Sequence, residues 1–222
     1  MKQEFIIEDC SLVRCATGRA CCNLRELLDA VRSAEPIVLE HHLMRCALED
    51  HFELYEFPND LARWSWDALG DRELAEELAL LNPYARCGIE GARAQLIDIL
   101  EEHLWALERV PWCRPGLELH LVESRLVAFD TGERFSTLAG LVEALPRMSR
   151  RSLFFHVHEA YRRKNVDDFS SWLEEIGAPD ELVQRLRKID FYFLNLNQLR
   201  EQFLEHLCAF LAEPKAVLGG AA

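Results

Sequence analysis

The sequence is short of positive charge. It carries 25 lysine and arginine residues against 38 aspartate and glutamate residues, for a formal net charge of −13. Nucleic acids are bound mainly through lysine and arginine, so we expect no nucleic-acid partner. Basic side chains do form two clusters, which we interpret as solvated surface, with a small phosphate or carboxylate pocket as the alternative. The clusters are Arg147, Arg150 and Arg151, and then Arg162, Arg163 and Lys164.

Membrane and targeting signals are also missing. No apolar run is long enough to cross a bilayer, and Met1-Lys2-Gln3-Glu4 does not begin a signal peptide. The eight cysteines include no Cys-x-x-Cys pair, so neither a zinc knuckle nor a redox pair is indicated. We expect reduced cysteines that fill the core of a cytoplasmic protein. Cys21 and Cys22 precede a predicted helix whose dipole can activate a thiol, but no base lies near them in sequence.

Catalytic signatures are absent as well. The chain contains no Gly-x-Ser-x-Gly, Walker A or dinucleotide-binding sequence. It also lacks Glu-x-x-His, His-Glu-x-x-His and His-Asp, which are typical of di-iron proteins, zinc proteases and metal phosphohydrolases. We therefore predict no metal site and no cofactor.

The clearest positive feature is a stretch that occurs twice. Residues 58–64 read Pro-Asn-Asp-Leu-Ala-Arg-Trp, and residues 166–172 read Val-Asp-Asp-Phe-Ser-Ser-Trp. In each copy a polar pair that can cap a helix precedes a tryptophan on the apolar face of the first turn. Upstream, Thr17-Gly18 matches Thr131-Gly132, and His42 matches His156 at the same offset. Ordered matches of this kind indicate an internal repeat.

We therefore predict a mainly α protein with a pseudo-twofold internal duplication. Each half would be a short strand or hairpin, turning on its Thr-Gly pair, followed by about five helices. The two strand-like segments could also pair with each other. The expected boundaries are a first repeat at 1–110, a connector at 111–116, a second repeat at 117–213 and a tail at 214–222, with the repeats packed as one unit.

The repeated polar residues are the candidates for a functional site. His42 and His156 could be metal ligands or acid–base groups, although a structural histidine is the favoured interpretation. Asp60 and Asp168 could orient these histidines or act as general acids, and helix capping explains them more simply. A further set could bind a ligand. The tryptophans could stack on a sugar, with packing in the core as the alternative. The Thr-Gly pairs could bind an anion through backbone amides, with a simple turn as the alternative. This set is Thr17, Gly18, Trp64, Thr131, Gly132 and Trp172.

The order of motifs resembles a bacterial family, domain-of-unknown-function family 5752. The resemblance lies in Arg14-x-x-Thr17-Gly18, Pro58-Asn59-Asp60-x-Ala62, Leu69-Gly70-Asp71, Phe155-His156 and Asp167-Asp168-Phe169-Ser170-x-Trp172, and it covers nearly the whole chain. It implies at most an association with carbohydrate metabolism, because genes of the family tend to accompany glycosyltransferase and alpha-glucan or trehalose genes.

The sequence thus favours a non-catalytic accessory protein that binds a protein partner or a small ligand. The alternative is a carbohydrate-related enzyme whose site is shared between the repeats around His42, His156, Asp60 and Asp168. The substrate, the partner and the oligomeric state are not encoded in any recognisable motif.

Overall fold

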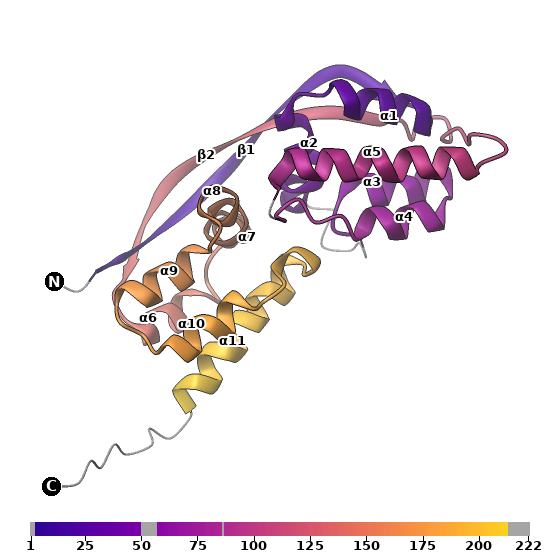
Figure 1. Ribbon diagram of the computed structural model, residues 1–222. Helices are drawn as coiled ribbons and strands as arrows, with labels where there is room; N and C mark the ends of the chain where they lie inside the picture. Colours follow the sequence, from indigo (N-terminus) through magenta and orange to yellow (C-terminus); the bar gives the residue numbers. More distant parts are fainter. Residues whose placement is uncertain (1–2, 50–56, 86, 213–222) are drawn as a thin grey trace, which may run out of the picture.

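A long two-stranded ribbon connects two helical lobes (Figure 1). The computed structural model describes residues 3–49, 57–85 and 87–212. Strand β1 (Phe5–Cys21) pairs antiparallel with β2 (Leu119–Phe135) along their whole length, from Phe5 opposite Phe135 to Cys21 opposite Leu119. The possibility that the two strand-like segments pair with each other is therefore confirmed.

Helices form both lobes. The first lobe contains α1 (Leu24–Ser33), α2 (Pro36–Leu43), η1 (Arg45–Leu48), α3 (Asp60–Trp64), η3 (Ser65–Leu69), α4 (Arg72–Ala79) and α5 (Gly88–Ala106). The second contains α6 (Leu138–Ala144), α7 (Arg150–Phe154), η4 (Phe155–Glu159), α8 (Ala160–Lys164), α9 (Asp168–Glu175), α10 (Asp180–Arg187), η5 (Phe191–Phe193) and α11 (Leu196–Ala212). Helix α2 ends at Leu43, and residues 50–56 lie outside the described chain. The predicted tail also lies outside it.

The predicted fold class is wrong in its β component. Each half contributes one strand of 17 residues, not a short strand or a hairpin of its own. The reason is that the Thr-Gly pairs are bulges inside continuous strands. The register slips between Ala16 and Ala20 and again between Ile6 and Glu8, where Gly18 and Gly132 have φ values of 76° and 83°. A bulge bends and twists a strand without ending it, so the sheet continues between the lobes.

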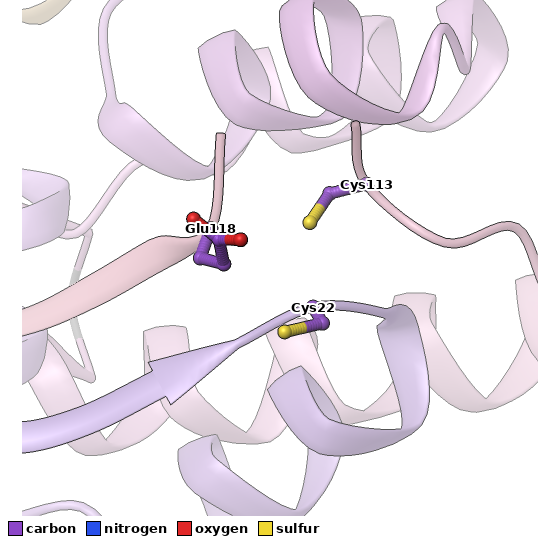
Figure 2. A group of neighbouring side chains, drawn as sticks. All are labelled: Cys22, Cys113 and Glu118. Atoms are coloured by element: carbon purple, nitrogen blue, oxygen red, sulfur yellow. The ribbon is translucent and has the colours of Figure 1, made fainter. Parts of the chain in front are cut away.

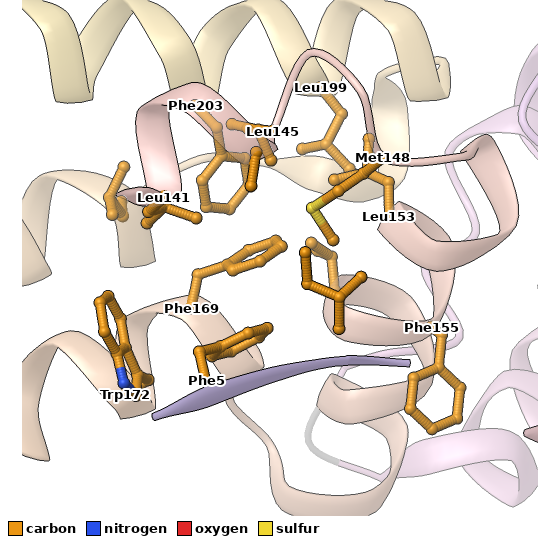
Figure 3. Packing of buried hydrophobic residues seen from close by; sticks show 14 of the residues in the cluster. Phe5, Leu141, Leu145, Met148, Leu153, Phe155, Phe169, Trp172, Leu199 and Phe203 are labelled. Carbon is orange, nitrogen blue, oxygen red and sulfur yellow. The ribbon is translucent and has the colours of Figure 1, made fainter. Parts of the chain in front are cut away.

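The two ends of the ribbon are buried in different lobes, one end in the core of each. Phe5 and Ile7 of β1 are buried in the core of the second lobe, whereas Leu119 and Leu121 of β2 are buried in the core of the first. Figure 3 shows Phe5 lying under Phe169, and the two rings are stacked with their centroids 5.3 Å apart. Each lobe therefore needs both strands to complete its core.

The two lobes also touch directly through aromatic side chains. The rings of Tyr84 and Tyr192 meet edge to face at 5.8 Å, and the Tyr192 hydroxyl accepts a hydrogen bond from the Asn59 amide at 3.3 Å. An ion pair between Arg162 and Glu40, at 3.4 Å, crosses the same boundary. These contacts and the ribbon link the two lobes.

The helix caps agree with the sequence in most places. Asn23 and Thr137 cap α1 and α6 through their side-chain oxygens. In the two repeated stretches the cap is the first polar residue, because Asn59 accepts from the amide of Ala62 and Asp167 from that of Ser170. No helix of the described chain has the length and apolar character needed to span a membrane.

The Asp167 cap provides a test of this assignment. Asp167→Ala should lower the free energy of unfolding by about 1 kcal/mol, the usual loss for a removed N-cap. Asp167→Asn should restore most of that loss, since an amide oxygen still accepts from the Ser170 amide. Chemical denaturation of the two variants measures both values. An alanine variant as stable as the parent would contradict the cap.

Candidate functional site

His42 is held at both ring nitrogens by the protein itself. Its Nδ1 lies 2.9 Å from Asp60 Oδ2, and its Nε2 accepts a hydrogen bond from the backbone N–H of Val122 at 3.1 Å. An Nε2 that accepts a hydrogen bond carries no proton, so the network assigns the Nδ1–H tautomer, with Nδ1 donating to the carboxylate. His42 and Asp60 are both buried. The pair links α2 and α3 to strand β2.

His156 makes the same three-part connection in the other lobe. Its Nδ1 lies 2.9 Å from Asp168 Oδ2, and its Nε2 accepts from the backbone N–H of Glu8 at 3.0 Å. This pair links η4 and α9 to strand β1. In both lobes the histidine is thus bound to the strand that also completes the lobe's core.

The four candidate residues form two pairs and not one shared site. His42 contacts Asp60 and His156 contacts Asp168. The prediction that the two aspartates cap their helices is wrong, because each stands one residue after the cap and points to a histidine. The alternative interpretation, that they orient the histidines, describes their contacts correctly.

The Asp60 carboxyl is ionised at all but very low pH. Burial, the largest influence, acts to raise its pKa, but hydrogen bonds from His42 and Arg63 prevail and lower the pKa to about 2. At Asp168, burial again raises the pKa, and the hydrogen bonds from His156 and Lys164 lower it below the ordinary value. Both aspartates are therefore carboxylates near neutral pH.

A cavity of about 330 Å³ lies beside the first pair, between the start of β2 and the helices of the first lobe. Its walls carry both signs of charge, with Trp64, Leu117 and Val122 as apolar surface. The charged and titratable residues that line it are Arg14, His41, His42, Glu49, Asp60, Arg63, Asp67, Glu118 and His120. A volume of this size accommodates a small ligand.

His41 faces the same cavity and has a different environment from His42. Its Nδ1 lies 3.1 Å from the Ser124 hydroxyl, and burial lowers its pKa to about 4, so the ring is neutral at pH 7. His41, His42 and Asp60 place donor atoms within 4.8 Å of one another. A metal ion there would have to displace the bond from Val122 or from Asp60, so this trio does not fit a metal centre.

The predicted ligand-binding residues lie in the cavity wall, in the core of the second lobe and in the two bulges of the ribbon. Trp64 lines the cavity, with its indole N–H donating to the Leu117 carbonyl at 2.8 Å. Trp172 lies in the core of the second lobe and donates to the Gln3 carbonyl at 3.0 Å. The Thr17 and Thr131 hydroxyls donate to backbone carbonyls of the opposite strand, at 2.8 and 2.7 Å, and so secure the bulges that contain Gly18 and Gly132.

The second basic cluster has carboxylate partners within the protein. Arg162 pairs with Glu159 and Glu40, and Lys164 pairs with Asp168 at 2.7 Å. In the first cluster, Arg150 and Arg151 line a separate hollow of about 320 Å³ together with Asp9. The carboxylates beside both clusters offset their charge and weaken the case for an anion pocket.

The cysteines do not form an activated nucleophile in the cores. All eight lie in the described chain as free thiols. Burial raises the pKa of Cys10 to about 12 and that of Cys21 to about 11, so both remain protonated. The expectation that the cysteines fill the core holds for Cys10, Cys21 and Cys46, but it is wrong for Cys15, Cys87 and Cys208, which are exposed.

His158 makes the protein sensitive to acid. The ring is buried between Phe154 and Tyr84, its Nε2 has no partner among the described residues, and burial lowers its pKa to about 3. Because the folded state binds this proton more weakly than the unfolded state, the stabilisation is complete above pH 6.5 and is lost as the pH falls toward 3.

We expect a loss of about 3–5 kcal/mol over this range from His158. His158→Phe should flatten the stability profile measured by urea denaturation at several pH values, and an unchanged acid slope would contradict this origin.

These contacts define a β-ribbon with a helical lobe at each end, and each lobe is bonded to the ribbon through one histidine–aspartate pair. The chain matches the family of unknown function (DUF5752) over residues 2–208, and it therefore belongs to that family. It is also similar to the structure of OrfY from Thermoproteus tenax, with 28% sequence identity and a TM-score of 0.74 over 93% of this chain and 94% of that chain. No curated protein matches the chain.

Proposed function

We propose that the protein is a non-catalytic accessory protein of the cytoplasm that binds a small hydroxyl-rich ligand, such as a sugar, in the cavity beside His42. The observation that carries the proposal is the use of both His42 ring nitrogens by the protein itself. A histidine bound in this way has no free nitrogen for proton transfer or metal binding. The residue that most resembles a catalytic group thus has a positioning role.

The cavity walls support a ligand of this class. A sugar presents hydroxyl groups that both donate and accept hydrogen bonds, and the cavity wall carries the Arg14–Glu49 ion pair, Arg63 bonded to Asp60, and the Asp67 carboxylate, with which such hydroxyls can share hydrogen bonds. Trp64 and Leu117 add apolar surface on which a sugar ring can rest. The link to carbohydrate metabolism implied by the family resemblance points to the same class.

The test is binding without turnover. Isothermal calorimetry on the full chain with glucose, an α-linked glucose disaccharide and a glucose phosphate should give saturable binding to at least one, and product analysis should find it unchanged. Arg14→Ala should weaken binding about tenfold, the loss of one charge-assisted hydrogen bond. Arg125→Ala is the matched control, because Arg125 is exposed on the ribbon and does not line the cavity.

Two results would overturn the proposal. Absence of binding to every probe would exclude the proposed sugar ligand and leave binding of a protein partner as the hypothesis to test. Conversion of a bound sugar, abolished by a change at His41 or Asp60, would make the protein an enzyme.

A further inference from the structure

Two cysteines and a glutamate meet at the end of the ribbon in the first lobe. The sulfur atoms of Cys22 and Cys113 and a carboxylate oxygen of Glu118 all lie within 4.8 Å of one another. Figure 2 shows Cys22 at the end of β1, Cys113 on the connector and Glu118 at the start of β2, with their tips directed into the same space. All three are partly exposed, so an ion can reach them from solvent.

Backbone contacts hold the two cysteines opposite each other. The amide of Cys113 donates to the carbonyl of Cys22 at 2.7 Å, and the neighbouring residues Asn23 and Trp112 form an antiparallel bridge. The connector is thus joined to the end of β1 at the point where both thiols emerge. The positions of the two sulfur atoms follow from this backbone geometry and not from side-chain packing alone.

Glu118 is held by its own set of bonds. Its Oε1 accepts from the backbone N–H of Gly116 at 3.1 Å, and the carbonyl of the preceding Leu117 accepts from the Trp64 indole at 2.8 Å. A hydrogen bond to a carboxylate from outside the donor set fixes the direction in which its oxygens point. The three donor groups are therefore arranged before any ion arrives.

We propose that Cys22, Cys113 and Glu118 form a binding site for a zinc ion. Two thiolates and one carboxylate are donors that zinc takes in tetrahedral sites, at about 2.3 Å for sulfur and about 2.0–2.2 Å for oxygen. Atoms within 4.8 Å of one another can close to the spacing of such a tetrahedron with small side-chain rotations. Three protein donors leave the fourth position to a water molecule or a ligand.

Charge favours the same ion. With both thiols ionised the donors carry three negative charges, which a divalent cation offsets in large part. The soft sulfur pair selects zinc over magnesium or calcium, which prefer all-oxygen sites.

Cobalt is the probe that reports the site directly. The full chain is reduced, freed of metal and titrated with Co²⁺ in the absence of oxygen. We expect one ion per chain, a thiolate-to-cobalt charge-transfer band and the intense visible bands of tetrahedral cobalt, all displaced by one equivalent of zinc. Cys22→Ser and Cys113→Ser should abolish the charge-transfer band or weaken binding at least a hundredfold, and Glu118→Gln should weaken binding about tenfold.

Matched controls separate the site from misfolding and from other thiols. Cys15→Ser removes an exposed thiol of the ribbon and should leave the titration unchanged. The metal-free variants should give the near-ultraviolet circular dichroism of the parent. The proposal is overturned if the reduced parent gives no thiolate–cobalt band, if the band survives in both cysteine variants, or if Cys22 and Cys113 form a disulfide whose reduction restores no metal binding. None of these measurements involves a sugar, so the site stands or fails independently of the proposed function.

Discussion

Replacing His42 with alanine is expected to lower the free energy of unfolding by about 3–5 kcal/mol, the cost of leaving a buried carboxylate without one of its hydrogen-bond donors. The change removes the donor to Asp60, whose side chain is 8% exposed, and the acceptor of the Val122 amide. The Val122 amide and the Oδ2 atom of Asp60 would then lose their hydrogen-bond partner, while Oδ1 of Asp60 keeps its bond from Arg63 at 2.9 Å. Urea denaturation of the full chain measures the loss.

A double-mutant cycle shows whether the loss comes from the pair. Asp60→Ala should cost a similar amount, and the two changes together should cost less than their sum, with a coupling of about 1–3 kcal/mol. His120→Ala is the control, because His120 is an exposed histidine of the same cavity and should change stability by no more than about 0.5 kcal/mol. Additive losses at His42 and Asp60 would contradict the pairing.

Phe5→Ala is expected to have an effect of the same size, about 3–5 kcal/mol. Phe5 stacks on Phe135 at 4.7 Å and on Phe169 at 5.3 Å, and it lies edge to face with Trp172 at 5.8 Å. Its removal opens a cavity in the core of the second lobe, although the residue stands at the beginning of the chain.

The neighbouring Ile6 provides the matched control for Phe5. Its side chain points away from the core and is 47% exposed, so Ile6→Ala should cost less than about 1 kcal/mol. Thermal melts followed by tryptophan fluorescence, with Trp172 in the affected core, compare the two variants. Equal losses, or no loss at Phe5, would contradict the assignment of β1 to the second lobe.

Local chemistry made much of the helical structure predictable. The polar pairs at residues 59–60 and 167–168 located the starts of α3 and α9. The cap at Asp167 located α9, although the role was expected at Asp168. One capping oxygen explains the start of a helix, but a sequence with two adjacent polar residues does not say which of them faces the amides.

The ribbon was harder to predict because its bulges look like turns. Thr17-Gly18 and Thr131-Gly132 have the composition of a hairpin turn, and only the opposite strand shows that the chain continues. Each bulge faces a single residue of the partner, Leu121 or Ile7, whose carbonyl accepts from the threonine hydroxyl. That contact joins residues more than a hundred positions apart, so no local pattern contains it. The predicted internal duplication remains a prediction.

The sites required the same long-range information. Sequence singled out His42 and Asp60 and gave their pairing only as an alternative to capping, and it singled out neither Glu49 nor His120 in the cavity wall. Cys22 and Cys113 showed no metal motif because their spacing is not that of a local chelate. Only the bridge between Asn23 and Trp112 brings them together.

The protonation states of the two paired histidines decide whether they are purely structural residues. Long-range proton–nitrogen correlation spectra of the ¹⁵N-labelled full chain at neutral pH report which ring nitrogen carries the proton. We predict that His42 and His156, assigned with His42→Gln and His156→Gln, are both neutral Nδ1–H tautomers whose Nε2 is unprotonated and hydrogen-bonded. An Nε2–H tautomer or a charged ring at either position would free a nitrogen for chemistry and contradict a purely structural role.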